Sequence, residues 1–326
     1  MLQYTAINPV YELQRDEYLH LDLANHLAWG YISLPPFTSW IAYIIKLLGN
    51  GVFWVKFFPA LFGALTILVV WKIIEALSGN MFALCLGAAA ILFSVLVRIN
   101  ILFQPNSSDI FFWTLFYYII VKYISTAHVK WLYAAGVAAG LGLLSKYNFA
   151  FLLLGLLPAI LLSQHRRLFT EKAFYISIGI AFIIVLPNLV WQYQNHFPTI
   201  HQLDELVRTQ LDNVERFDFV KQQLFFFVNS IFVIVAAFIA LFFYPPFKKY
   251  QLFVWNFIFT IALYIWFKAK GYYAIGLYPV FIAFGAVYLE KILSNGRKKY
   301  LQPGLLILVP ALSVPLLMIS NQNHWC

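Results

Sequence analysis

Apolar runs long enough, or nearly long enough, to cross a lipid bilayer recur along most of the chain. A helix needs about 20 apolar residues to span the hydrocarbon core. Hydrophobic residues make up 62% of the sequence and charged residues 11%, against roughly 25% charged residues in soluble domains. The sequence therefore predicts an all-α polytopic membrane protein. The ten expected spans are residues 52–76, 81–101, 107–124, 131–144, 148–162, 173–191, 222–244, 252–267, 273–292 and 303–319.

The charged residues between these runs predict the two sides of the membrane. The runs HRR, PFKK and GRKK lie in connections of one side, which the positive-inside rule assigns to the cytoplasm. We therefore interpret the formal net charge of +9 as a topology signal, and we expect no nucleic-acid partner. Cys85 and Cys326 are too few for a disulfide framework. The opposite, extracytoplasmic side is expected to carry Glu12, Asp16, Glu17, Asp22, Asp109, Asp204, Glu205, Asp212, Glu215 and Asp218.

One polar stretch differs from the rest of the chain. Residues 14–40 read QRDEYLHLDLANHLAWGYISLPPFTSW and place Arg15, Asp16 and Glu17 together on the acidic side. A plain alternative is that the two carboxylates only favour the start of a surface helix, where the helix dipole is positive. No other long polar block could hold the chemistry, so we expect residues 14–51 to form a catalytic extracytoplasmic loop with interfacial helices.

Further polar residues fall at the ends of spans on the same side. A carboxylate at the mouth of a span is usually paired or functional, because an unpaired charge there is costly. Snorkelling to the interface is the plain alternative for the basic residues. Their shared side predicts an anionic ligand at membrane level, with a carboxylate as general base and cations stabilising a departing phosphate. These residues are Asp109, Asn106, Arg98, Lys146, Lys268, Lys270 and Tyr273.

Two other features complete this reading. His20, Asp22 and His26 are weak candidates for metal ligands, because their spacing allows pairs on one helix face, and a divalent cation remains an open alternative. Residues 192–221 form the one long hydrophilic loop after the first, and apolar residues recur at helical spacing between 200 and 218. We expect an interfacial helix or a lid there.

Four motifs occur in order along the chain and carry a family resemblance. They are RDEYLHLDLANHLAWGY followed by Pro35-Pro36, LGLLSKYNFAFLL, PNLVWQYQNHFPT and KGYYAIGLYP. Together they resemble integral-membrane glycosyltransferases with the GT-C fold, in particular protein O-mannosyltransferase and lipid A aminoarabinose transferase relatives of the glycosyltransferase family 39 type. The resemblance covers nearly the whole chain.

The resemblance implies an inverting enzyme of the bacterial inner (plasma) membrane. Such an enzyme moves a sugar from a polyprenyl-phosphate carrier to a lipid, glycan or protein acceptor at the periplasmic or outer face. By position Asp16 would be the base that deprotonates the acceptor and Glu17 its partner. Either Asp109 or Asn106 would occupy a second acidic position, where relatives commonly have Asp directly after the Pro. Arg15, with the cations named above, would contact the substrate.

The chain also departs from the family pattern. Ser33-Leu34 stands before the two prolines, where relatives often carry Asp-His or Glu-Lys. Relatives have a full span before the acidic loop, so we expect that a first span is missing or truncated in an otherwise single domain of residues 1–326.

Two other classes stay open. A transporter or flippase of a lipid-linked or anionic substrate would also carry intramembrane charges, although no internal repeat is evident. An inactive member that binds lipid or scaffolds an assembly is the third possibility. The glycosyltransferase reading requires Asp16 and the cations, above all Lys146, Arg98 and Lys268, to converge on one cavity.

Overall fold

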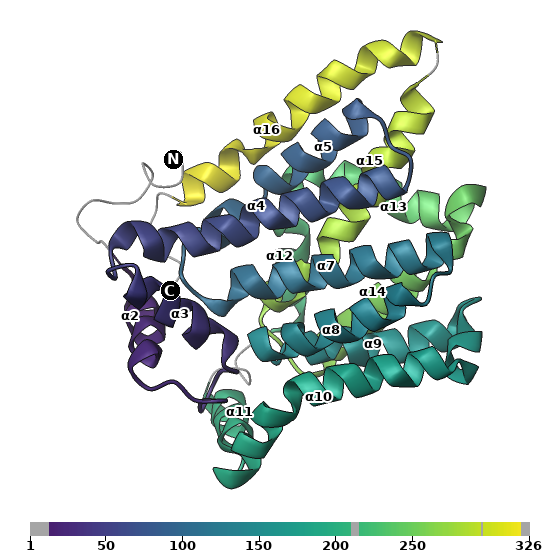
Figure 1. The fold of residues 1–326 in the computed structure, drawn as a ribbon. Helices are drawn as coiled ribbons and strands as arrows, with labels where there is room; N and C mark the ends of the chain where they lie inside the picture. Colours follow the sequence, from purple (N-terminus) through teal and green to yellow (C-terminus); the bar gives the residue numbers. More distant parts are fainter. Residues whose placement is uncertain (1–12, 210–214, 295, 321–326) are drawn as a thin grey trace.

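The apolar runs fold into helices that lie side by side along one direction (Figure 1). The computed structural model describes residues 13–209, 215–294 and 296–320, and this part of the chain contains helices and no β-strand. The helices that matter below are α2 (Arg15–Asp22), α3 (Phe37–Leu47), α4 (Val52–Ala76), α5 (Met81–Leu92), α6 (Leu96–Ile99), α7 (Pro105–Thr126), α8 (Lys130–Ser145), α9 (Phe149–Leu162), α10 (Lys172–Gln194), α11 (Pro198–Thr209), α12 (Arg216–Phe226), α13 (Ile231–Phe243), α14 (Leu252–Trp266), the 3₁₀ turn η6 (Gly271–Leu277), α15 (Tyr278–Leu293) and α16 (Leu301–Ser320).

Helices occur in all ten ranges expected to span the membrane. Among the described residues, three helical stretches are long and apolar enough to cross a membrane by themselves: Val52–Ala76, Lys172–Gln194 and Gly271–Leu293. A bent pair, α12 with the helical stretch up to the end of α13, makes a fourth if it counts as one span. The others are shorter than a straight crossing requires or less apolar.

The expectation of an unbroken span is wrong in two places. The span 81–101 ends at Leu92, and the span 222–244 is bent by 56° near Phe227. The two breaks meet and satisfy each other's backbone groups. The N–H of Val95 donates to the carbonyl of Phe226 (3.3 Å), and the Asn229 side chain donates to the carbonyl of Ala90 (3.2 Å). Such pairing is what lets helices break inside an apolar environment.

Glycines allow the closest helix contacts. α8 packs against α10, and α13 packs against α15. A Cβ atom added at Gly136 would collide with the carbonyl oxygen of Ser177, and one at Gly285 would collide with that of Val233. Small residues at these crossings bring the backbones together, and membrane helices rely on such packing in place of a hydrophobic driving force.

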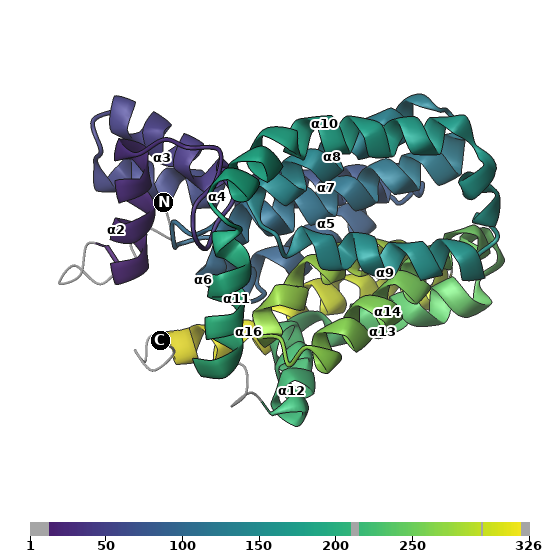
Figure 2. The same ribbon diagram turned by 90° about the horizontal axis from the view of Figure 1, so that it is seen from below.

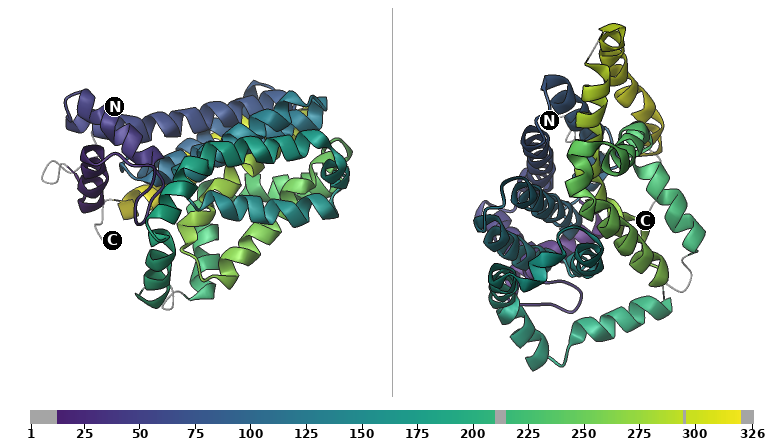
Figure 3. Two further views of the ribbon diagram at one scale, coloured as in Figure 1. Left: turned by 60° about the horizontal axis from the view of Figure 1, so that its bottom comes forward. Right: turned by 90° about the vertical axis from the view of Figure 1, so that its right-hand side faces the viewer.

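The two ends of the bundle differ in character. α2, α3 and α11 lie at one end, on the left of Figure 1, and Figure 2 places them at the same end from another direction. The connections from α4 to α5, from α9 to α10 and from α13 to α14 lie at the other end, where the expected cytoplasmic runs HRR and PFKK occur. The right-hand view of Figure 3 looks at this second end.

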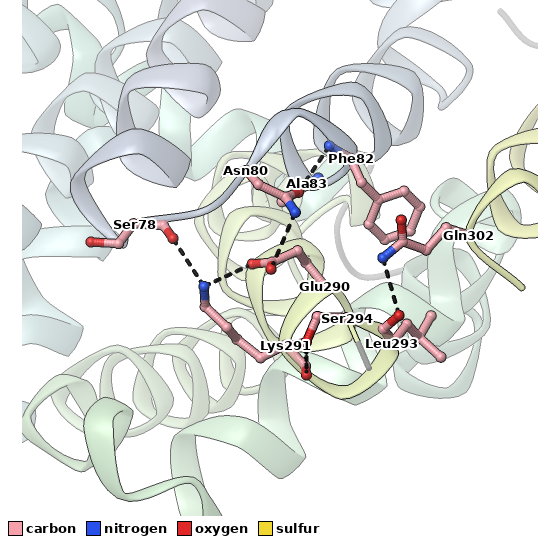
Figure 4. Close-up of polar contacts among 9 residues, drawn as sticks. All are labelled: Ser78, Asn80, Phe82, Ala83, Glu290, Lys291, Leu293, Ser294 and Gln302. Atoms are coloured by element: carbon pink, nitrogen blue, oxygen red, sulfur yellow. Dashed lines mark hydrogen bonds and ion pairs between the residues drawn. The ribbon is translucent and has the colours of Figure 1, made fainter. Parts of the chain in front are cut away.

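A buried carboxylate fastens the second end (Figure 4). Glu290 of α15 accepts a hydrogen bond from Asn80 (3.3 Å), whose oxygen caps α5, and pairs with Lys291 (3.1 Å). Lys291 also donates to the carbonyl of Ser78 (3.2 Å), and Gln302 of α16 donates to the carbonyl of Leu293 (3.2 Å). These contacts hold the α4–α5 turn, α15 and α16 together far from the acidic loop.

Candidate functional site

Glu17 anchors the polar loop to the bundle. Its side chain is fully buried, and both carboxylate oxygens lie 2.7 Å from the ammonium nitrogen of Lys56 on α4. The backbone N–H groups of Phe103 (2.7 Å) and Gln14 (2.8 Å) donate to the same carboxylate. One side chain therefore ties α2 to α4 and to the segment that precedes α7. A buried charge needs such pairing and hydrogen bonding to be tolerated.

Asp16, the neighbouring carboxylate, is accessible. Its side chain is 43% exposed in the first turn of α2, and its Oδ1 atom lies 3.4 Å from Nε of Arg15, whose side chain is 94% exposed. The Asp16 Oδ2 atom also accepts a hydrogen bond from Gln104 Nε2 (3.3 Å). The two adjacent carboxylates thus have different environments: Glu17 is enclosed by protein and Asp16 is open to solvent.

Lys146 lies in the connection between α8 and α9, at the same end of the bundle. Its ammonium nitrogen donates to Asn106 Oδ1 (2.6 Å) and lies 4.5 Å from the ring centroid of Tyr273 and 5.3 Å from that of Tyr272. Aromatic faces attract a cation electrostatically. The side chain is therefore held in place from two sides before any ligand binds.

A chain of hydrogen bonds joins Asp16 to Lys146. Gln104 donates to Asp16 as described above, and Asn106 Nδ2 donates to Gln104 Oε1 (3.0 Å). Lys146 then donates to Asn106 Oδ1. Two amide side chains therefore link the Asp16 carboxylate to the Lys146 ammonium.

Asp109 is an internal carboxylate. It is buried, and it accepts hydrogen bonds from Trp113 Nε1 (2.9 Å) and Asn148 Nδ2 (2.8 Å). Asn148 also donates to the carbonyl of Tyr273 (3.0 Å) and accepts from the hydroxyl of Tyr264 (2.7 Å). The network fixes α7, the α8–α9 connection and η6 relative to one another.

The surroundings of Lys146 also change its pKa. Burial lowers the pKa of Lys146 to about 8; the nearby Asp109 carboxylate opposes this, and the charge of Lys270 adds to it. The ammonium therefore titrates just above neutral pH.

The other cations expected at the site, Lys270, Lys268 and Arg98, differ in how close they lie to Lys146. Lys270 is close enough to Lys146 to act on it electrostatically. Lys268 precedes it in the same turn, is half-buried and has a left-handed backbone with φ of 51°. Arg98 lies on α6 and is half-buried, and its side chain makes no hydrogen bond or ion pair with another described residue. The structure brings Asp16, Lys146 and Lys270 into one region, and it shows no contact that links Arg98 to them.

The weak metal candidates do not gather around one point. The structure places no group of three or more His, Cys, Asp or Glu residues that could hold a metal ion among the described residues. His20 is buried, and burial lowers its pKa, which Asp16 and Glu17 partly oppose. Asp22 accepts a hydrogen bond from Asn25 (3.0 Å), and His26 is exposed.

The start of the expected 192–221 loop is helical and is tied to the site. α10 continues to Gln194 and α11 covers Pro198–Thr209, whereas Asp212 lies outside the described residues. Gln192 donates to the hydroxyl of Tyr147 (3.0 Å) and to Thr199 (2.7 Å). Tyr147 follows Lys146 directly, so α10 and α11 are connected to the α8–α9 junction.

Asn188 links this region to the polar loop. Its side chain donates to the carbonyl of Trp29 (2.7 Å) and accepts from the Tyr147 hydroxyl (3.2 Å). Residues 14–51 are therefore fastened at Glu17 on one side and at Trp29 on the other.

An apolar groove of about 450 Å³ runs between α7, α8, α9 and α10. Tyr147 and Asn188 lie at its end near the site, and His165 and Leu168 lie at the other end of the bundle. Leucine, isoleucine, alanine and phenylalanine side chains line most of its length. The groove thus leads from the membrane interior to a position one residue from Lys146.

Two residues of this arrangement were missed by the sequence reasoning. Lys56 lies within the span expected at 52–76. An unpaired charge is costly there, so its position indicates a buried partner. Gln104 carries no charge, and neither motif nor periodicity singles it out.

Known proteins resemble the chain in both sequence and fold. The model of the dolichyl-phosphate-mannose-protein mannosyltransferase family matches residues 33–191. A lipid A galacturonosyltransferase from Rhizobium johnstonii is 23% identical over 193 residues, which are 59% of this chain and 41% of the relative. A lipopolysaccharide core galacturonosyltransferase from the same organism is 26% identical over 199 residues, 57% of this chain and 38% of the relative.

Two solved structures have similar folds. The ArnT protein from Cupriavidus metallidurans, crystallised with undecaprenyl phosphate, matches with a TM-score of 0.74 at 18% identity, over 96% of this chain and 62% of that chain. An oligosaccharyltransferase from Archaeoglobus fulgidus matches with a TM-score of 0.55 at 12% identity, over 94% of this chain and 50% of that one. These comparisons confirm the polytopic GT-C fold and the resemblance to GT-C glycosyltransferases. The chain spans about two fifths of the length of the curated relatives it matches.

Proposed function

We propose that this chain is the membrane domain of an inverting glycosyltransferase that takes a sugar from a polyprenyl-phosphate carrier. The observation that carries the proposal is the hydrogen-bonded chain from the accessible Asp16 carboxylate to the buried Lys146 ammonium. A transfer reaction from a phosphate-linked sugar needs a base for the incoming hydroxyl and a cation for the outgoing phosphate. Both groups lie at one end of the bundle and are joined by two side chains.

The apolar groove supports a lipid-linked donor. It ends beside Tyr147, and the cation that would bind a phosphate is the preceding residue, Lys146. A carrier of this kind has an apolar tail and an anionic head, which matches a groove that leads to a cation. The ArnT structure, with a similar fold, contains undecaprenyl phosphate, which agrees with a carrier of this class.

The proposed reaction uses the Asp16 carboxylate as the base and the Lys146 ammonium as the cation. The acceptor hydroxyl attacks the anomeric carbon on the face opposite the phosphate, and its proton passes to the Asp16 carboxylate. The bond between the anomeric carbon and the phosphate oxygen breaks, and its electron pair leaves with the polyprenyl phosphate. The new charge on the phosphate is stabilised by Lys146, with Lys270 nearby.

We assign the other two carboxylates positioning roles. Glu17 holds α2 on the bundle through Lys56, and its complete burial separates it from any acceptor. Asp109 holds Asn148 and the α8–α9 connection and thereby places Lys146. Both differ from the catalytic roles expected from the sequence.

The proposed acceptor and sugar are inferred from the names of the relatives. Their names point to lipid A and to the lipopolysaccharide core. We therefore propose a glycolipid acceptor of the cell envelope and a uronic acid or related sugar on the donor. The site would face the periplasm of a bacterial inner membrane, because the basic connections lie at the opposite end of the bundle.

Sugar transfer in membranes tests the proposal. Membranes from cells that express the chain are incubated with envelope lipids and polyprenyl-phosphate donors labelled in the sugar. Asp16→Asn should lower transfer by about a hundredfold or more, as expected for loss of a general base. Asp218→Asn is the matched control, because Asp218 is an exposed carboxylate paired with Lys221 (3.1 Å) outside the site. Transfer by Asp16→Asn at the wild-type rate would remove the base from the mechanism.

Donor binding tests the cation separately. Lys146→Met should weaken binding of the polyprenyl-phosphate donor by at least about tenfold, because a charge-assisted contact to phosphate is lost. Lys122→Met is the control, since Lys122 near the end of α7 also lies over an aromatic ring, that of Trp131 (5.5 Å), and is not part of the site. Donor binding without any transfer would favour an inactive lipid-binding protein, and movement of intact donor across the bilayer would favour a flippase.

A further inference from the structure

Gln104 occupies the central position between the two groups proposed to act on the substrates. Its amide nitrogen donates to Asp16 Oδ2 (3.3 Å), and its amide oxygen accepts from Asn106 Nδ2 (3.0 Å). The two contacts use both ends of the amide. Gln104 touches neither Lys146 nor the buried Glu17 in this network.

The direction of each hydrogen bond in this chain is fixed by its two ends. An ammonium group such as Lys146 can only donate, so Asn106 must turn its oxygen toward it. The Asn106 nitrogen then faces Gln104, which must present its oxygen. The Gln104 nitrogen is thereby turned toward Asp16, and an ionised carboxylate can only accept. Amide orientation, otherwise ambiguous, is therefore determined by the network.

The backbone of Gln104 is held as firmly as its side chain. Gln104 precedes Pro105, the first residue of α7, and has the extended conformation (φ −138°, ψ 160°) that a residue before proline favours. The preceding residue, Phe103, donates its N–H to Glu17 Oε1 (2.7 Å). The segment is thus attached to α2 one residue from Asp16, which fixes the distance over which the Gln104 side chain must reach.

We propose that Gln104 is a positioning residue that orients the Asp16 carboxylate and couples it to the cation at Lys146. The amide engages Oδ2 of Asp16, whereas Oδ1 contacts the exposed Arg15 Nε (3.4 Å) and keeps a second lone pair for the proton of the acceptor hydroxyl. The orientation of the base then depends on the cation that binds the donor phosphate, through Asn106. This inference rests on the proposed transferase function and adds to it a residue that acts through Asp16.

Steady-state kinetics of two Gln104 variants test the inference. Gln104→Leu should lower kcat by about tenfold to a hundredfold, the range for loss of a hydrogen bond to a charged group, with the donor KM within about twofold. Gln104→Glu keeps the shape but presents an acceptor to Asp16, so kcat should fall at least as far. Gln302→Leu is the matched control, because Gln302 also donates to a single acceptor, the carbonyl of Leu293, at the opposite end of the bundle.

A double-mutant cycle separates positioning from a merely structural role. If Gln104 acts through Asp16, adding Gln104→Leu to Asp16→Asn should not reduce the residual rate further. An equal fold-loss in both backgrounds, or a wild-type kcat for both single Gln104 variants, would overturn the inference. Asp16→Asn at the wild-type rate would instead overturn the proposed function itself, so the two failures are distinguishable.

Discussion

The ammonium nitrogen of Lys56 lies 2.7 Å from both carboxylate oxygens of Glu17, and the two side chains are 9% and 0% exposed. The pair comes from α4 and α2, and it is the main polar attachment of the loop that carries Asp16. Because the Glu17 carboxylate also accepts two backbone N–H groups, its orientation is fully determined. The position of the accessible carboxylate therefore depends on its enclosed neighbour.

Lys56→Met should destabilise this attachment strongly. Removing one partner of a buried ion pair leaves an uncompensated charge, which costs about 3–5 kcal/mol. We expect a lower melting temperature in detergent, faster proteolysis within residues 14–51 and loss of sugar transfer. Lys46→Met is the control, because Lys46 is exposed and bonded only to Asn25 (2.7 Å).

The double variant Lys56→Met with Glu17→Leu should recover much of the stability lost in the single variant. It removes the unpaired Glu17 charge and places apolar side chains at both positions. Replacing a buried ion pair in this way often leaves the free energy of unfolding unchanged or increases it. A double variant as unstable as Lys56→Met alone would contradict this account of the pair.

Donor binding should weaken as the pH rises through about 8. Burial lowers the pKa of Lys146 to about 8, so its charge is present below this pH and lost above it. The dissociation constant of the polyprenyl-phosphate donor should increase toward about tenfold per pH unit beyond that point. Asp109→Asn removes the interaction that raises the pKa of Lys146, so the weakening should begin at a lower pH. Binding that is constant between pH 7 and 10 would exclude Lys146 as the phosphate contact.

The acidic loop should loosen in mild acid because of His20. Burial lowers the pKa of His20 from its ordinary 6.5, and its Nδ1 atom lacks a hydrogen-bond partner. The unfolded segment therefore binds a proton below about pH 6.5 more readily than the folded one, so stability present above this pH is lost as the pH falls. The melting temperature should fall from pH 7.5 to pH 5.5, and His20→Leu should reduce this fall. The exposed His201→Gln should leave it unchanged.

The sequence predicted the helices more reliably than the contacts within the candidate site. Apolar length alone places α4, α10 and α14 close to their observed bounds. The breaks after Leu92 and near Phe227 could not be predicted, because each depends on hydrogen bonds from the other, more than a hundred residues away. Local patterns carry no information about such partners.

In the candidate site, too, contacts between residues distant in the sequence could not be predicted. Counting spans places Asp16 and Lys146 at the same end of the bundle, and the hydrogen bonds through Gln104 and Asn106 agree with this. Which of the two adjacent carboxylates is enclosed depends on Lys56, a residue of another helix, so the sequence did not show that Glu17 is buried and Asp16 accessible. Gln104 was not predicted because a neutral amide gains its role only from the charged groups at either end of the network.

The apolar groove should determine which donor chain lengths the protein uses. Ala181 of α10 lines the groove between its two ends, so Ala181→Trp should fill part of its volume of about 450 Å³. A long isoprenoid chain must then leave the groove, whereas a donor with only two isoprene units would need only the part near Tyr147. We expect the KM for a long-chain donor to rise by about tenfold, and the KM for the short-chain donor to change by less than about twofold, since a few buried methylene groups account for such a difference. Ala262→Trp on α14 is the matched control, because Ala262 is exposed outside the groove. Equal effects of Ala181→Trp on both donors would show that the carrier tail lies elsewhere, and the transfer assay with Asp16→Asn would remain an independent test of the chemistry.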